Sequence, residues 1–315
     1  MSFLSTAVQN VLDHGEFCSV ASTTPAGPHC TPLVFALSGG RIWLTTSRRS
    51  VKARAWSLDP SMAGLVRHED LAVAFTGTVR TFDLLDRRTW AATVADAPQL
   101  ARASVTFSRK NARFFAGYAV DAKQVPFAWT PPGRVFVGID VERTALLDEG
   151  GVQEGRSRWG GDVSSHDSFR ASKRGSPAFA RLPTDVRDVI GGRGDGALAI
   201  SGSRGPAVVP CRWLAEEGTL YAALPVETLS LADAGSDATV ALTVDRASAW
   251  RAREMVGAMV QGTGSTFALG PLETGARSAK TVLNRVDPGS DALVRIAPSR
   301  LVWWHGWSSG SADIA

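Results

Sequence analysis

The chain of 315 residues is long enough for two domains, and its content of 44% hydrophobic and 20% charged residues is typical of a globular protein, which excludes global disorder. Its 34 Lys and Arg residues against 30 Asp and Glu give a formal net charge of +4. This mild excess is scattered along the chain without a nucleic-acid-binding motif, so it favours a small anionic ligand over DNA or RNA.

The cysteines and the N-terminal segment bear on the cellular compartment. Cys18, Cys30 and Cys211 are far apart and odd in number, which fits neither a disulfide framework nor a zinc site with paired cysteines, so we expect a reducing compartment. Residues 1–17 have the apolar spacing of an amphipathic helix and lack the basic flank of a signal peptide. No window approaches 18 apolar residues, so no membrane span is expected.

Short strands separated by Gly and Pro turns follow this segment. The pattern predicts strands over residues 17–22 and 28–37, joined by a hairpin turn over residues 24–27. A second turn, which contains Gly39 and Gly40, leads into an apolar strand that begins at Arg41. The first half therefore begins with hairpin-connected strands.

The strand from Arg41 opens into a basic loop rich in hydroxyl groups, residues 45–50. Ser50 is placed to cap a helix that Pro60 ends. Free backbone N–H groups, hydroxyls and the ammonium of Lys52 would then converge on one point, which predicts an anion site and most simply a phosphate site. The composition leaves a solvated turn before a surface helix open as the alternative.

The rest of the first half is predicted to contain two further strands around a helical stretch. Residues 71–82 predict a strand, residues 83–119 a helical stretch, and residues 134–147 an apolar strand rich in β-branched side chains. The helical stretch thus separates the last two strands of this half.

The same pattern returns in the second half. Three blocks recur in the same order, namely residues 27–32 at 205–210, residues 77–82 at 262–267, and Ile139 with Arg143 at Ile296 with Arg300. Three matches in one order indicate a tandem repeat of one domain.

The two repeats differ at the predicted anion loop. The first half has hydroxyls and Lys52 there, whereas the second has residues 223–228, with no lysine and with Glu227, which would repel a phosphate. We therefore expect the second loop to have lost its anion site. The predicted domains are residues 1–149 and residues 181–315, with a Gly-, Ser- and Arg-rich linker or mobile loop over residues 150–180.

Thr46, Ser50, Lys52 and Pro60 stand at spacings that resemble the phosphate loop of the pyridoxamine 5'-phosphate oxidase-like, FMN-binding split-barrel superfamily. The resemblance implies a mainly β fold with flanking helices (α+β), in which two tandem split β-barrels form a pseudo-dimer. It also implies that Thr46, Ser50 and Lys52 hold a cofactor phosphate. The oxidase itself usually has an arginine where this chain has Val51, so one charge-assisted contact is missing unless a nearby arginine replaces it.

Members of this superfamily usually bind their cofactor in a groove between two barrels, so the second half is expected to complete the site. Trp213 and the Trp-rich segment 303–307 are candidates to lie against a flavin-like ring, although tryptophans also fill barrel interfaces. No catalytic residue or metal ligand is predicted. The residues predicted to bind the cofactor are Thr45, Thr46, Ser47, Arg49, Ser50, Lys52, His29, Pro32 and Trp304, with a structural role as the alternative for His29.

The resemblance implies hydride transfer between bound FMN and a small organic substrate, with the deazaflavin F420 as the alternative cofactor. Haem is a third option, because some split-barrel relatives bind it through a histidine, for which His305 is the candidate. No hydrolase motif is present, and the tail over residues 308–315 lacks the arginine and histidine that pyridoxamine phosphate oxidases use, which disfavours pyridoxal phosphate synthesis.

A non-catalytic flavin- or haem-binding protein, acting as a carrier or sensor, is the competing class of function. We expect a cytoplasmic protein with a small-molecule substrate and with neither a nucleic-acid nor a membrane partner. The tandem organisation predicts either a monomeric pseudo-dimer or a homodimer.

Overall fold

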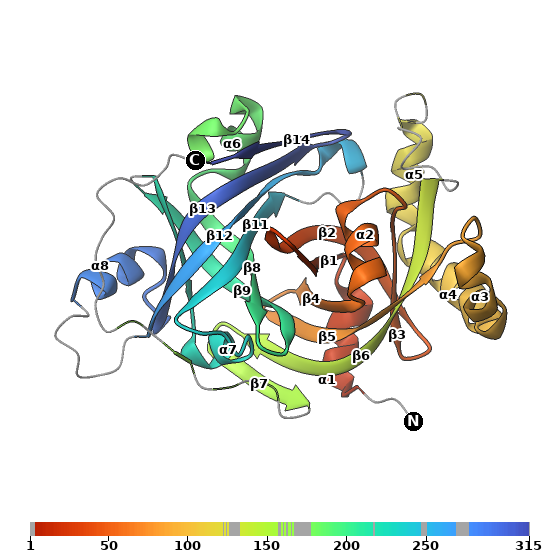
Figure 1. Cartoon of the computed structure of the whole chain (residues 1–315), viewed down its shortest axis with the longest axis horizontal. Helices are drawn as coiled ribbons and strands as arrows, with labels where there is room; N and C mark the ends of the chain where they lie inside the picture. Colours follow the sequence, from red (N-terminus) through yellow and green to blue (C-terminus); the bar gives the residue numbers. More distant parts are fainter. Residues whose placement is uncertain are drawn as a thin grey trace.

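A computed structural model of the chain describes residues 4–121, 123, 125, 133–156, 159, 161, 163–164, 166, 178–216, 218–246, 251–268 and 277–314. The described residues form two antiparallel sheets of seven strands, one in each half (Figure 1). Helices flank both sheets, so the fold is mainly β, as the sequence predicts.

The first sheet closes into a barrel. Its strands are β1 (Phe17–Thr24), β2 (Gly27–Ser38), β3 (Arg41–Ser47), β4 (Ser61–His68), β5 (Leu71–Phe82), β6 (Arg134–Asp148) and β7 (Gly151–Arg156). They follow the order β3-β2-β1-β4-β5-β6-β7, and β3 also pairs with β6. This extra pairing closes six strands into a ring and leaves β7 outside it.

The second sheet repeats this arrangement strand for strand. Its strands are β8 (Arg193–Gly202), β9 (Gly205–Glu216), β10 (Thr219–Leu224), β11 (Asp237–Arg246), β12 (Val256–Ala268), β13 (Ala292–His305) and β14 (Ser308–Asp313). The order is β10-β9-β8-β11-β12-β13-β14, and β10 also pairs with β13. The chain is therefore a tandem of two closed six-stranded barrels, which confirms the predicted architecture.

The helices lie at the margins of the barrels. They are α1 (Thr6–His14), α2 (Val51–Leu58), α3 (Trp90–Ala95), α4 (Ala97–Lys110), α5 (Ala112–Val120), α6 (Thr184–Ile190), α7 (Val226–Ser230) and α8 (Arg277–Val286), with short 3₁₀ turns η1 (Arg87–Thr89), η4 (Ala178–Arg181) and η5 (Ala252–Glu254). The predicted N-terminal helix is α1, which buries its apolar face. The predicted helical stretch 83–119 is divided into η1, α3, α4 and α5, at the right of Figure 1.

The internal repeat extends to local irregularities of the backbone. The pairing of β5 with β6 shifts register at Gly77, and that of β12 with β13 shifts at Gly262. An added Cβ would lie 2.3 Å from the carbonyl oxygen of Asp140 at the first glycine and 2.0 Å from that of Ala297 at the second. Only glycine permits these close approaches, so both β-bulges are built into the repeated sequence.

Strand β4 is an element of the first barrel that the sequence analysis does not predict. It follows Pro60 and contains Gly64, two features that usually mark a loop. Strand pairing on both edges and burial of residues 62–66 override these signals. An added Cβ at Gly64 would lie 2.2 Å from the ring of Phe75, so the glycine is required for packing. Strand β7 lies within the segment 150–180, and residues 167–177 of that segment are outside the described residues.

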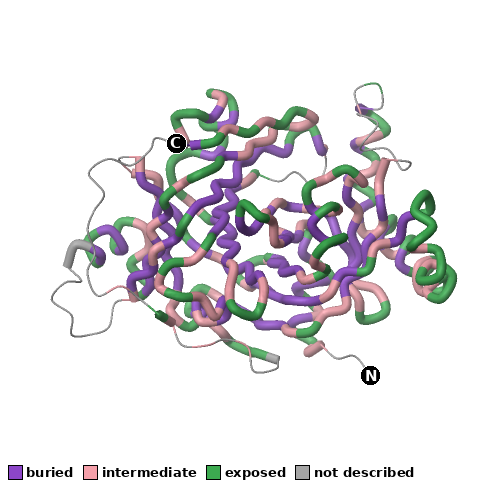
Figure 2. The backbone as a smooth tube through the Cα atoms, in the orientation of Figure 1, coloured by how far each residue is buried: buried purple, intermediate pink, exposed green. Residues whose placement is uncertain are grey.

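The two barrels share one hydrophobic core cluster. It combines residues such as Cys30 and Leu65 of the first barrel with Leu198 and Met259 of the second. Figure 2 shows the buried stretches concentrated in the strands of both barrels and the exposed ones in the outer helices and turns. Side chains of the second barrel also donate to the backbone of β2: the Thr243 hydroxyl to the Cys30 carbonyl at 2.8 Å, and the amide of Gln261 to the Pro28 carbonyl, also at 2.8 Å. The halves are therefore joined by both apolar burial and buried hydrogen bonds.

Candidate functional site

The hydroxyl-rich loop leads into α2 in the way that the sequence predicts. Ser50 is the N-cap of this helix, and its Oγ accepts a hydrogen bond from the backbone N–H of Ala53 at 3.0 Å. The Thr46 hydroxyl donates to the same oxygen at 3.0 Å. The predicted cap is confirmed, and two hydroxyls and the first turn of a helix meet at the end of β3.

Lys52 is buried beside this cap, with only 3% of its surface exposed. Its ammonium donates a hydrogen bond to the hydroxyl of Thr31 on β2, and no carboxylate of the described residues lies within ion-pair distance. Burial lowers the pKa of Lys52 to about 8, because the charged form is desolvated without a compensating anion. A buried cation without an acidic partner is a site prepared for an anionic ligand.

A groove of about 340 Å³ adjoins Lys52. One wall consists of β2, the end of β3 and the start of α2, and the other consists of β13, the turn after it and β14 from the second half. Most residues predicted to bind the cofactor line this groove, namely His29, Pro32, Thr46, Ser47, Ser50, Lys52 and Trp304. Residues so distant in sequence meet here because the second barrel packs against the first.

Two predicted residues lie outside the groove. Thr45 points to the opposite face of β3 from Thr46, because successive side chains of a strand alternate. It lines a separate cavity next to the groove. Arg49 is exposed in the turn before α2 and is not among the residues that line the groove. The neighbouring Arg48 pairs with Asp83 at 2.9 Å instead of facing the groove.

Arg134 is a groove residue that the sequence analysis missed. The antiparallel pairing of β3 with β6 places it opposite Ser47. Its guanidinium donates to Thr45, at 2.9 Å to the hydroxyl and 2.7 Å to the carbonyl oxygen, and burial lowers its pKa. The internal repeat could have drawn attention to this position. The strand pairing in the second half places an acidic residue, Asp291, at the position equivalent to Arg134. Other groove residues missed from sequence are Thr31, Leu33, Ala252, Met255, Val302, Ser308 and Ser309, whereas Trp303, Gly306 and Trp307 belong to the Trp-rich segment that the sequence analysis singles out.

His29 is held in its neutral form inside the groove. Burial lowers its pKa to about 3, and the positive charges of Lys52 and Arg300 act in the same direction. At neutral pH the imidazole therefore has one donor and one acceptor nitrogen and adds no positive charge to the groove.

Two aromatic candidates from the second half lie elsewhere. His305 pairs with Asp185 at 2.5 Å and is not among the groove residues. Trp213 is buried and stacks on Phe179 with ring centroids 5.2 Å apart, so it is not available to the groove. Trp213 therefore does not line the groove; it lines instead a cavity between the two halves.

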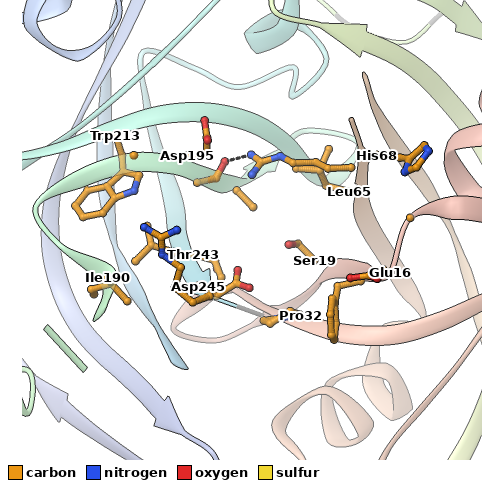
Figure 3. A pocket seen from close by; sticks show the side chains of 18 of the residues that line it. Glu16, Ser19, Pro32, Leu65, His68, Ile190, Asp195, Trp213, Thr243 and Asp245 are labelled. Carbon is orange, nitrogen blue, oxygen red and sulfur yellow. Dashed lines mark hydrogen bonds between the residues drawn. The ribbon is translucent and has the colours of Figure 1, made fainter. Parts of the chain in front are cut away.

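A different cavity, of about 520 Å³, lies where the two halves face one another (Figure 3). Equivalent strand positions line it from both sides: Leu65 with Thr243, and Arg67 with Asp245. Arg67 donates to the Gly196 carbonyl, and burial raises the pKa of Asp245 to about 6 in spite of Arg67. Acidic and basic side chains both line this cavity. Among its described lining residues, Pro32 is the only one predicted to bind the cofactor.

The positions of the second half that correspond to Lys52 and Arg134 carry the opposite charge. Pro225 takes the place of Ser50 as N-cap, which puts Glu227 where α2 has Lys52. The strand register puts Asp291 where β6 has Arg134, and its carboxylate accepts from the backbone N–H of Val226 at 2.5 Å. Two cations of the first site are thus replaced by two carboxylates, which disfavour an anionic ligand.

Three solved structures that this chain matches each cover less than half of it. A conserved hypothetical protein from Mycobacterium tuberculosis is 23% identical, with 47% of this chain and 86% of that chain covered and a TM-score of 0.33. A pyridoxamine 5'-phosphate oxidase-related, FMN-binding protein from Nostoc punctiforme is 17% identical, covering 47% and 87%, with a TM-score of 0.33. An F420 reductase is 16% identical, covering 45% and 98%, with a TM-score of 0.31.

No family model matches the sequence, and no curated protein matches it. Within the part of the chain that the structure describes, no helix combines the length and the apolar character that crossing a bilayer requires. The strand order of the two sheets shows that the chain consists of two split β-barrels in tandem, which is the fold that the sequence resemblance implied.

Proposed function

We propose that the groove binds FMN by its phosphate, with F420 as the alternative, and that the protein is an oxidoreductase acting on a small organic molecule. The observation that carries this proposal is the buried ammonium of Lys52, which has no acidic partner among the described residues. The Thr31 hydroxyl accepts a hydrogen bond from it, and the hydroxyls of Thr46 and Ser50 line the same groove. A phosphate bound there would provide the missing negative charge.

The lining of the groove suits both parts of a flavin nucleotide. The first half contributes Lys52 and several hydroxyls, whereas Met255, Trp303 and Trp304 of the second half offer an apolar surface for a flat ring. A volume of about 340 Å³ lies within the range of roughly 300 to 1,000 Å³ that is usual for small-molecule sites. The bound flavin would supply the hydride chemistry, and the chain needs only to bind, orient and shield it.

The residues of this chain then have separate tasks. Lys52, Thr46 and Ser50 bind the phosphate, and the tryptophans of the second half exclude water from the ring. Arg134 keeps a positive charge at the wall of the groove, since its guanidinium is fixed by Thr45. Neutral His29 offers a hydrogen bond without repelling or attracting the phosphate.

The test is titration of the purified full chain with FMN and with F420, followed by absorbance and fluorescence. Binding of either, together with reoxidation of the reduced cofactor by a small organic acceptor, would support the oxidoreductase. Failure of both cofactors to bind would reject the proposal.

A non-catalytic flavin carrier or sensor is the second candidate. The observation in its favour is that three tryptophans, Trp303, Trp304 and Trp307, gather on one wall of the groove, where they could cover a ring completely. Tight binding without turnover by any acceptor would select this function. Haem binding through His305 has no support in the arrangement, because that ring pairs with Asp185 outside the groove.

A further inference from the structure

A third cavity, of about 580 Å³, lies next to the groove under helices α4 and α5. We call it the α4–α5 pocket. Its walls are mainly aromatic, with Phe107, Phe114, Phe115 and Phe136 as the principal side chains. Such a lining takes up a flat apolar compound, because burial of apolar area stabilises the bound state.

The polar groups of the α4–α5 pocket include Arg134, Thr45 and Tyr118, which lie close together. The guanidinium of Arg134 is bonded to Thr45, and both residues line the pocket together with Tyr118. Burial raises the pKa of Tyr118 to about 12, so its phenol remains a hydrogen-bond donor at neutral pH. A positive charge and a phenolic donor at one end select a ligand with a carbonyl or anionic oxygen there.

The pocket and the groove adjoin at this polar end. Arg134 lines both cavities. Tyr118 of the pocket stacks on Trp307 of the groove, with ring centroids 5.5 Å apart and an interplanar angle of 28°. Arg253 of the second half pairs with Asp121 at 3.4 Å and fixes the end of α5 at this boundary. A ligand in the pocket would therefore lie next to a ring held in the groove.

The helices that build the pocket occur only beside the groove that keeps its cations. Between β5 and β6 the first half inserts α3, α4 and α5, whereas the described residues between β12 and β13 form α8 alone. The second half, which carries Glu227 and Asp291, thus has no equivalent of these helices in its described part. The α4–α5 pocket and the two cations Lys52 and Arg134 therefore occur in the same half, as expected if they are parts of one site.

We propose that the α4–α5 pocket binds the organic substrate, an aromatic and largely apolar compound whose carbonyl or anionic oxygen faces Arg134. The role as substrate site rests on the proposed function of the groove. Binding of such a compound to the pocket does not rest on it, because protein side chains line the pocket in its described part.

The test uses anilinonaphthalene sulfonate, an aromatic anion whose fluorescence rises on binding, with the cofactor-free full chain. Ser108→Trp places a large side chain at the pocket and should weaken probe binding about tenfold or more. Val94→Trp, at an exposed position of the neighbouring helix α3 that does not line the pocket, is the matched control and should bind the probe like the unchanged protein. Ser104→Trp provides a second pocket variant if the first does not fold.

The outcomes separate the pocket from the groove. Probe binding that survives saturating FMN, and that Lys52→Met leaves unchanged, supports the pocket. Equal affinity in Ser108→Trp, Ser104→Trp and the control would overturn the proposal, as would displacement of the probe by FMN without an effect of either pocket variant. If FMN does not bind at all yet both pocket variants weaken the probe, the proposed function fails and the pocket stands.

Discussion

The Lys52 ammonium donates a hydrogen bond to the Thr31 hydroxyl and so joins the first turn of α2 to strand β2. This bond alone compensates the buried charge, because no carboxylate of the described residues approaches it. The chain thus maintains an unneutralised cation in its interior, at a cost in stability that ligand binding would recover.

Replacing Lys52 should separate binding from stability. Lys52→Met removes a charge-assisted hydrogen bond worth about 1.5–3 kcal/mol, which weakens FMN binding by about one to two decades. The midpoint of urea unfolding should stay the same or rise, because a desolvated charge is lost. Arg54→Met, at an exposed position of α2, is the control and should leave affinity unchanged. Unchanged FMN affinity in Lys52→Met would reject the phosphate site.

The affinity for FMN should decrease as the pH rises above about 8. Below this pH, which matches the lowered pKa of Lys52, the free protein already carries the ammonium. Above it, phosphate binding must be accompanied by proton uptake, so the affinity should fall by up to about tenfold per pH unit. Isothermal titration between about pH 7 and pH 10 measures this dependence. The second pKa of a phosphate ester is near 6, so the phosphate stays doubly charged over this range and its own protonation does not change the affinity. The variant Lys52→Arg stays charged and should give a flat profile; a flat profile for the unchanged protein would contradict the assignment.

Titration should saturate at one cofactor per chain. Glu227 and Asp291 stand where the first site has Lys52 and Arg134, so the second groove repels an anion. Calorimetric stoichiometry measures this directly. Two cofactors per chain would show that the second half also contains a binding site.

The second half should contribute binding energy through its tryptophans. Trp304→Ala removes on the order of a hundred Å² of apolar contact, which at about 25 cal/mol per Å² corresponds to roughly 2.5 kcal/mol and a loss of between one and two decades in FMN affinity. Trp90→Ala, in the exposed helix α3, is the matched control. Equal affinities of the two variants would show that the second barrel does not cover the ring.

The bulge glycines should be essential for stability. Gly77→Ala and Gly262→Ala would each place a methyl group against a backbone carbonyl, at 2.3 and 2.0 Å, and should lower the free energy of unfolding by about 2 kcal/mol or more. Gly155→Ala is the control, since nothing lies within 4 Å of its added Cβ. Urea denaturation compares the three. Wild-type stability in both bulge variants would mean that the strands can realign without cost.

The sequence by itself determined several elements of the first half and the repeat. Periodicity and turn residues are local properties, so they were sufficient for β1 to β3, for the cap at Ser50 and for the matching of Gly77 with Gly262. The difference between the two predicted anion loops could also be predicted from the sequence, because it depends on residue type alone. The first loop is followed by Lys52, and the second contains Glu227.

Only the tertiary structure decided which residues share the site. Arg134 reaches Thr45 because β6 closes the barrel against β3, a pairing across a long sequence separation that no local pattern encodes. Alternation along β3 turned Thr45 away from the groove. Burial of Lys52, and with it the lowering of its pKa, arises from packing against β2. Trp304 reached the groove and Trp213 did not, because the position of each side chain depends on how the second barrel packs against the first.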